Sequence, residues 1–146
     1  MQVSDEDRKR RQGKMILVVD DDPEIADFIK LVLEHAGFTV MVVHKGEDAL
    51  ATLARITPVA ILLDVNLDPK DRDWDGYETC SRIRNNYREL KAPVIFVTVR
   101  KTQADVKRAV QVGGDYFVTK PLAADKLLER IVHALGRGRL ERKGIR

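Results

Sequence analysis

Short apolar runs alternate with amphipathic segments along most of the chain. The apolar runs are rich in β-branched residues, which is typical of strands that are buried on both faces. They lie at residues 15–19, 39–43, 59–63, 94–98 and 116–118. The segments between and after them carry apolar residues at helical spacing, at about residues 23–35, 46–56, 77–87, 102–112 and 123–135. The pattern predicts five strands, each followed by a helix.

The ends of these predicted helices carry suitable residues. Asp22 is expected to cap the first helix, and Pro23 suits its first turn because the missing N–H would have no partner there. Gly37 suits its end. Thr102 is expected to cap the fourth helix, which should stop at Gly113, and Gly136 is expected to stop the fifth.

Strands that alternate with helices in this way imply an α/β fold, a doubly wound five-stranded parallel sheet with helices on both faces. In such a sheet, ligands bind beyond the carboxyl ends of the strands, where the order of the strands reverses. The residues that end the strands are therefore the candidates for function.

Charged and polar side chains stand at four of the predicted strand ends. Three consecutive aspartates, residues 20–22, follow the first strand, and Asp64 follows the third. Thr98 ends the fourth strand, and Lys120 follows the fifth. Each feature alone is more often structural, for instance a helix cap or a turn. Together, at strand ends that should meet at one edge of the sheet, they predict a site that holds carboxylates, a hydroxyl and an ammonium group.

A divalent cation fits this site. Crowded carboxylates repel, so at least one of them would stay protonated unless a cation balanced the charge. Because the candidate ligands are all oxygens, the cation should be hard, and Mg²⁺ fits best. A cation, an ammonium group and a hydroxyl around a free carboxylate form a receptor for a transferring phosphoryl group. That carboxylate would be the nucleophile.

The ordered set of motifs resembles the receiver domains of bacterial two-component response regulators, the CheY-like family. The matching segments are ILVVDDDPEI at 16–25, LLDVNL at 62–67, DGYE at 75–78, PVIFVT at 93–98 and TKP at 119–121. The resemblance covers about residues 15–135. It implies a flavodoxin-like fold with strand order 2-1-3-4-5.

The resemblance also implies a metal site and a phosphoacceptor. Asp64 would accept the phosphoryl group. Asp21 and Asp64 would bind Mg²⁺ directly, together with the backbone carbonyl of Asn66, and Asp20 would act through water. The domain would catalyse its own phosphorylation and dephosphorylation, with no turnover of an external substrate as in an enzyme.

Three further residues are implied in catalysis and switching. Thr98 and Lys120 would contact the phosphoryl oxygens. Phe117 stands where the family often has Tyr, and with Thr98 it is the candidate switch to the face formed by the fourth helix, fifth strand and fifth helix. A plain core role for Phe117 fits the sequence equally well. The phosphoryl donor would be a sensor histidine kinase or a histidine phosphotransfer protein, and a downstream protein would bind the switched face.

The loop after Asp64 departs from the family pattern. It reads VNLDPKDRDWDG and reaches its Asp-Gly pair about four residues later than usual. The segment from Asp68 to Asp75 is acidic, and we expect it to be largely a solvated loop of unassigned role. It places Trp74 close to the predicted metal site.

Composition and charge narrow the class of protein. The chain has 146 residues, a length that fits one domain. Its net charge of +3 comes from its ends, since residues 1–14 carry +2 and residues 136–146 carry +4, which leaves −3 for residues 15–135. Both ends are expected to be charged, solvated tails, and binding of nucleic acid is not favoured.

The remaining composition favours a cytoplasmic location. Cys80 is the only cysteine, which excludes an intramolecular disulfide. The apolar runs are far shorter than the roughly 20 residues of a membrane span, and no apolar stretch precedes residue 15 as in a secretory signal.

Two other functions remain open from the residues alone. A phosphatase of similar topology would use two aspartates with the spacing of Asp20 and Asp22, but Pro23 follows them and no cap domain is present. A flavin or nucleotide carrier would need a glycine-rich loop after the first strand, where acids stand instead. After Leu135 too few residues remain for a DNA-binding module, so the chain is expected to be a stand-alone receiver or a fragment of a longer regulator or hybrid kinase.

Overall fold

Strands and helices alternate along the chain in the computed structural model, which describes residues 2–67, 74–99 and 102–139. The strands of the described chain are β1 (Met15–Val19), β2 (Thr39–Val43), β3 (Ala60–Asp64), β4 (Val94–Thr98) and β5 (Tyr116–Thr119). Its helices are α1 (Asp5–Arg11), α2 (Pro23–His35), α3 (Gly46–Leu53), α4 (Gly76–Asn86), α5 (Gln103–Val112) and α6 (Ala124–Arg137). None of the helices in these ranges combines the length and apolar character that a membrane crossing requires.

The five strands form one parallel sheet in the order β2-β1-β3-β4-β5, which confirms the predicted doubly wound fold. The order reverses between β1 and β3, because the chain runs outward to β2 on one side and to β4 and β5 on the other. All strands are parallel, so their carboxyl ends lie at the same edge.

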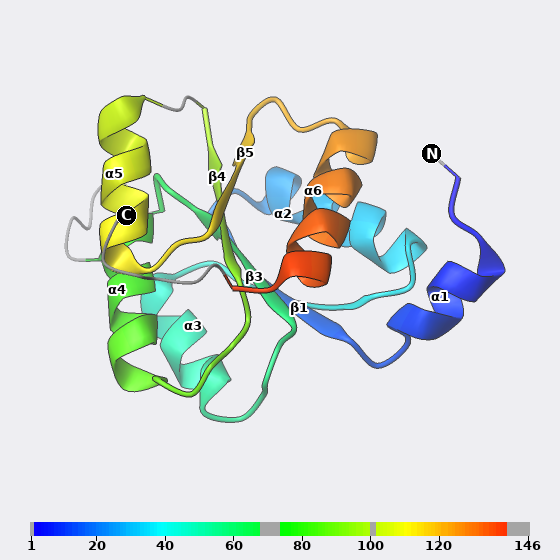
Figure 1. Ribbon diagram of the computed structural model, residues 1–146, viewed down its shortest axis with the longest axis horizontal. Coiled ribbons are helices and arrows are strands. Elements are labelled where there is room, and N and C mark those ends of the chain that lie inside the picture. The colour runs from blue at the N-terminus through cyan, green and yellow to red at the C-terminus, as the bar shows by residue number, and fades with distance from the viewer. Residues whose placement is uncertain (1, 68–73, 100–101, 140–146) are drawn as a thin grey trace.

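Helices cover both faces of the sheet (Figure 1). On β1, Ile16 and Val18 point into a core with α2 and α6, while Leu17 and Val19 point into a core with α3, α4 and α5. All four side chains are at most 1% exposed. Burying an apolar side chain of this size contributes about 1.5–3 kcal/mol, so continuous apolar strands with helices on both sides stabilise the sheet.

Most predicted helix ends are confirmed. The Asp22 side chain accepts the N–H of Glu24 at 3.0 Å and begins α2. Gly113 ends α5 with a φ of +97°, a conformation that strongly favours glycine. The predicted stop of the last helix at Gly136 is wrong: α6 continues to Arg137, and Gly138, with a φ of +66°, is the C-cap.

Residues 1–14, which the sequence predicts as a charged tail, include the helix α1, which has no buried residue. Ser4 caps α1 by accepting the N–H of Asp7 at 3.1 Å. Acidic residues fill the first turn of α1 and basic residues fill the last turn. This distribution opposes the helix dipole at both ends and stabilises so short a helix.

Helix α1 docks on the carboxyl end of α2. Arg8 donates to the carbonyl of His35 at 3.0 Å, and Arg11 donates to the carbonyl of Ala36 at 3.1 Å. These carbonyls belong to the last turn of a helix and would otherwise lack partners. The backbones approach closely, since a Cβ on Gly37 would lie 2.7 Å from Cα of Arg8.

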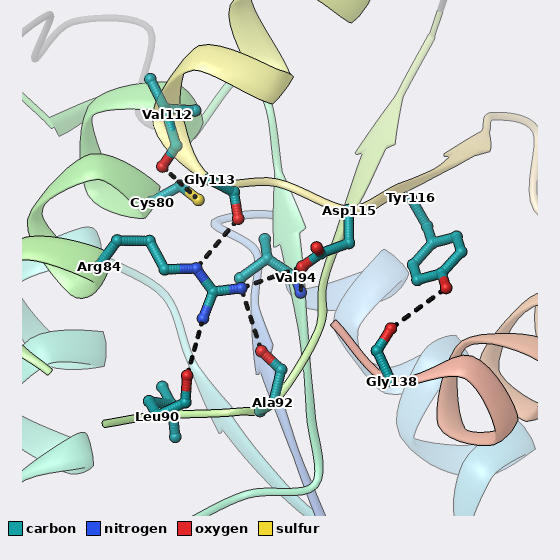
Figure 2. A network of polar contacts seen from close by, with 10 residues as sticks. All are labelled: Cys80, Arg84, Leu90, Ala92, Val94, Val112, Gly113, Asp115, Tyr116 and Gly138. Carbon is teal, nitrogen blue, oxygen red and sulfur yellow. Dashed lines mark hydrogen bonds and ion pairs between the residues drawn. The ribbon is translucent and has the colours of Figure 1, made fainter. Parts of the chain in front are cut away.

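A buried arginine ties α4 to the sheet (Figure 2). The Arg84 guanidinium lies 3.0 Å from the Asp115 carboxylate, and the two side chains are 10% and 0% exposed. Asp115 also accepts the backbone N–H of Val94 at 3.0 Å. The remaining N–H groups of Arg84 reach the backbone carbonyls of Leu90, Ala92 and Gly113. This network joins α4, the start of β4 and the turn before β5, at the amino edge of the sheet.

Candidate functional site

Carboxylates from two adjacent strands meet at the carboxyl edge of the sheet. Asp20 follows β1 and Asp64 ends β3, and these strands pair in parallel as far as Val19 and Leu63. Carboxylate oxygens of Asp20, Asp21 and Asp64 lie within 4.8 Å of one another. Asp20 and Asp64 are buried, at 1% and 3% exposure, whereas Asp21 is exposed. The switch point of the strand order therefore carries a compact acidic cluster that is open on one side.

Asp20 is shielded from solvent, and only one of its two carboxylate oxygens accepts a hydrogen bond from the described residues. Its Oδ1 accepts the N–H of Asp22 at 2.9 Å. Its Oδ2 is buried, and no donor in the described part of the chain reaches it. Burial, reinforced by the nearby charge of Asp64, raises the pKa of Asp20 to about 6. A buried carboxylate oxygen without a donor is costly, and a cation bound nearby, with its coordinated water, would compensate for that cost.

The backbone of Asp20 is also held. The Nδ1–H of His44, at the end of β2, donates to the Asp20 carbonyl at 2.8 Å. The Asp20 N–H donates to the carbonyl of Val43 at 3.1 Å. Position 20 is thus fixed by the neighbouring strand, a contact that the sequence pattern alone does not reveal.

Asp64 is paired with a lysine. Nζ of Lys120 lies 3.4 Å from Oδ1 of Asp64, and the Asn66 backbone N–H donates to the same oxygen at 3.1 Å. Among the described residues, Oδ2 of Asp64 accepts no hydrogen bond. Burial raises the pKa of Asp64, while the charge of Lys120 opposes that rise. The carboxylate is thus held through one oxygen, and the other is available to a ligand.

Thr98 completes the arrangement of polar groups at this edge. It ends β4, one residue beyond Val97, which pairs with Asp64 across β3 and β4. Its side chain is buried at 4% exposure. The Lys120 N–H donates to the Thr98 carbonyl at 2.7 Å, which fixes the ends of β4 and β5 together. Asp20, Asp21, Asp64, Thr98 and Lys120 therefore share one edge of the sheet, as expected from their strand ends.

Phe117, on β5, packs against the core. Its ring is half-buried, and its centroid is 5.8 Å from that of Phe96. This packing fits the core role that the sequence leaves open for Phe117, and a switching role stays a prediction. The metal-binding role of the Asn66 carbonyl also stays a prediction.

The inserted loop lies partly outside the described residues, which leave out Asp68, Asp71 and Asp73. Trp74 is described, and the Arg82 guanidinium lies 4.0 Å from the centroid of its ring. The Trp74 ring also reaches α3, since a Cβ on Gly46 would lie 2.8 Å from it. Trp74 thus anchors the end of this loop between α3 and α4.

Gly76 has a role that the sequence analysis missed, although its Asp-Gly pair was noted as a motif. Its N–H donates to the Val65 carbonyl at 3.0 Å. Any side chain at this position would collide with the backbone carbonyl of Asp64. The first residue of α4 therefore packs against the backbone of Asp64. Only glycine fits at this position, because it has no side chain.

The donor set fits Mg²⁺. Three carboxylates on one side of a small space supply hard oxygen ligands, and the buried Oδ2 of Asp20 is oriented without a protein donor. Lys120 adds a fixed positive charge beside Asp64. An anion with several oxygens, such as a phosphoryl group, is the ligand that this combination of charges would accept.

Comparison with known proteins points to one family. The family described as "Response regulator receiver domain" matches residues 16–132. A putative response regulator from Chloroflexus aurantiacus has 29% identity and a TM-score of 0.75, with 85% of this chain and 98% of that chain covered. The signal receiver domain of a histidine kinase from Syntrophus aciditrophicus has 29% identity and a TM-score of 0.74, with 90% and 96% covered.

Two curated relatives are longer than this chain. The transcriptional regulatory protein TrcR of Mycobacterium tuberculosis is 32% identical over 116 residues, which are 80% of this chain and 43% of TrcR. The transcriptional regulatory protein GltR of Pseudomonas aeruginosa is 35% identical over 125 residues, which are 86% of this chain and 50% of GltR. The chain therefore spans about half the length of these relatives.

Proposed function

The chain belongs to the response regulator receiver domains of two-component signalling, and from this premise we propose that it is a Mg²⁺-dependent phosphoacceptor. The observation that carries the proposal is the meeting of Lys120, Asp64 and the acidic pair Asp20–Asp21 at one edge of the sheet. The proposed location is the cytoplasm, where such signalling chains meet their kinases.

The acidic cluster would hold the cation. Asp21 and Asp64 would bind it directly with the backbone carbonyl of Asn66, and Asp20 would act through water. When bound, Mg²⁺ would neutralise negative charge on the transferring phosphoryl group. Asp20 would then be stable as a carboxylate in spite of its burial.

Asp64 would be the nucleophile. Its carboxylate oxygen would attack the phosphorus of a phosphohistidine, forming a P–O bond as the P–N bond breaks and the imidazole leaves with the electron pair. The Lys120 ammonium and the Thr98 hydroxyl would hold the phosphoryl oxygens as their charge changes. Water would later hydrolyse the aspartyl phosphate, so the domain would turn over its own phosphoryl group and no external substrate.

The donor would be a sensor histidine kinase or a histidine phosphotransfer protein. The phosphoryl group would bias a two-state equilibrium of the surface. Thr98 and Phe117 are the proposed switch residues, and the face of α5, β5 and α6 is the proposed surface for a downstream protein. No role for nucleic acid binding by this chain is proposed.

The phosphatase alternative is disfavoured by Asp22. A phosphatase of this topology would need Asp22 as its second acid, but the side chain of Asp22 caps α2 by accepting the N–H of Glu24. It is therefore committed to the helix rather than to a substrate.

Acetyl phosphate tests the proposed function. We expect the intact mass of the protein to rise by one phosphoryl group with acetyl phosphate and Mg²⁺, and to stay unchanged when EDTA replaces Mg²⁺. An equal gain with EDTA would contradict the metal dependence, and no gain with Mg²⁺ would contradict the phosphoacceptor role.

A further inference from the structure

The first turn of α4 connects the phosphoacceptor to α5. At one end, Gly76 lies against the backbone of Asp64, as described above. The next residue, Tyr77, points the other way, toward α5. Its side chain is buried, with 5% of the residue exposed. A movement of the chain at Asp64 would therefore reach Tyr77 through a single intervening residue.

The Tyr77 hydroxyl is bonded to α5. It donates to Oδ1 of Asp105 at 3.2 Å. Burial and the charge of Asp105 raise the pKa of Tyr77 to about 12. The phenol is therefore protonated at neutral pH and is a constant donor to this carboxylate. Hydrogen bonds to an ionised acceptor are stronger than those between neutral groups.

Asp105 lies in the first turn of α5 and takes part in its N-terminal cap. Its Oδ2 accepts the N–H of Thr102 at 3.1 Å and the Thr102 hydroxyl at 2.7 Å, and its own N–H donates to that hydroxyl at 3.1 Å. This reciprocal arrangement is a capping box. One carboxylate thus serves both the cap of α5 and the contact with Tyr77.

Arg108 makes a second contact between the two helices. Its guanidinium lies 5.0 Å from the centroid of the Tyr77 ring. It also lies 3.9 Å from Oδ2 of Asp75, the residue that caps α4. The start of α4 is therefore joined to α5 at two points, Asp105 and Arg108.

The Tyr77 ring continues into the core. Its centroid is 5.1 Å from that of Phe96 on β4, which is 5.8 Å from that of Phe117 on β5. Phe96 is fully buried. Close packing on this side leaves Tyr77 little freedom, so a shift of α4 must be passed to its neighbours.

We propose that Tyr77 is a positioning residue that transmits phosphorylation of Asp64 to α5 through its hydrogen bond to Asp105. The inference rests on the proposed function, because it describes how phosphorylation at the same site would alter the face of α5, β5 and α6. The link differs from the Thr98–Phe117 switch in its elements, since it runs through α4.

The test compares two tyrosine hydroxyls at opposite ends of α4. Tyr77→Phe removes the bond to α5, whereas the control Tyr87→Phe removes a 2.7 Å bond from the C-cap of α4 to the Leu50 carbonyl of α3. Amide hydrogen exchange of Asp105 and Val106, whose N–H groups bond to Thr102, reports on the first turn of α5. Each protein is measured with Mg²⁺, before and after addition of beryllofluoride, a phosphoryl analogue.

We expect Tyr77→Phe to raise the exchange rates of these two amides by roughly tenfold before the analogue is added. The further change caused by beryllofluoride should be at least halved, while Tyr87→Phe keeps the wild-type change. Mass gain with acetyl phosphate should be unaltered in both variants. This separates transmission from phosphorylation, because only the response of α5 is altered.

An undiminished response of α5 in Tyr77→Phe, or an equal loss in Tyr87→Phe, would overturn the role of Tyr77. If Tyr77→Phe does not fold, Asp105→Asn weakens the same hydrogen bond by removing the charge of its acceptor, and an undiminished response of the Val106 amide there overturns the proposal. A wild-type protein that gains no mass at all would instead contradict the proposed function.

Discussion

Nζ of Lys120, after β5, lies 3.4 Å from Oδ1 of Asp64, at the end of β3. The two residues are 56 positions apart in the sequence but lie at the same edge of the sheet. Their side chains are 17% and 4% exposed. Burial raises the pKa of the Asp64 carboxyl, and the lysine charge opposes this. The lysine thus favours the ionised form that a nucleophile needs.

Replacing Lys120 should impair both the ionisation and the chemistry of Asp64. In Lys120→Met we expect the pKa of Asp64 to rise further and acetyl phosphate labelling to slow by about a hundredfold, as when one donor to a developing charge is removed. Carboxyl ¹³C NMR and the rate of mass gain measure the two effects. Lys126→Met, at an exposed lysine of α6, is the control. Wild-type rates in both variants would show that Lys120 is not involved.

Asp20 should destabilise the protein when no metal is bound. Its pKa in the folded protein is about 6, above its ordinary value of 3.8. The folded state therefore binds the proton more tightly, and the free energy of unfolding without metal should rise as the pH falls from about 6 toward 4.

Asp20→Asn removes this penalty. At pH 7.5 in EDTA we expect the variant to be about 2–3 kcal/mol more stable than wild type, from a shift of about two pKa units. Urea unfolding measures the difference, which should shrink as the pH falls and vanish below about pH 3, where Asp20 is protonated in both states. A variant less stable than wild type at pH 7.5 would contradict this account of the buried carboxylate.

Binding of Mg²⁺ should depend on pH through the same residue. Below about pH 6 the cation must displace a proton from Asp20, so its affinity should fall as the pH falls, by up to about tenfold per pH unit. Calorimetric titrations at pH 5, 6 and 7.5 test this, and proton release should accompany binding near pH 6. An affinity that is constant over this range would place the cation away from Asp20.

The buried pair of Arg84 and Asp115 should be important for stability (Figure 2). Arg84→Met leaves the Asp115 charge without its partner in the interior, and we expect a loss of about 3–5 kcal/mol in the free energy of unfolding. Arg82→Met is the matched control on α4. Its ion pair with Glu78 is partly exposed, at 37% and 41%, and its loss should cost about 1 kcal/mol or less. Equal losses in the two variants would contradict the claim that the buried ion pair contributes more to stability than the exposed one.

The strands and the gathering of acids could be predicted because each rests on a strong local signal, whereas the order of the strands followed from the resemblance to receiver domains. A continuous apolar run predicts a strand that is buried on both faces, and parallel strands bring the residues that end them to one edge. Asp22 and Thr102 were predictable caps, since their side chains serve amides two or three residues away.

Contacts between distant segments could not be predicted in the same way. Helix α1 has no apolar stripe long enough to be recognised, and its place depends on the Arg8 and Arg11 contacts with α2. The bond from Tyr77 to Asp105 spans 28 residues and depends on how two helices pack. The requirement for glycine at position 76 likewise appears only when α4 is placed against Asp64.

The most direct test is the site of phosphorylation. The intact mass after treatment with acetyl phosphate and Mg²⁺ is compared for wild type, Asp64→Asn and Asp22→Asn, in which the cap of α2 is preserved because Asn is an equally good cap. We expect wild type and Asp22→Asn to gain one phosphoryl group and Asp64→Asn to gain none. A gain in Asp64→Asn equal to that of wild type would contradict the central claim that Asp64 is the phosphoacceptor.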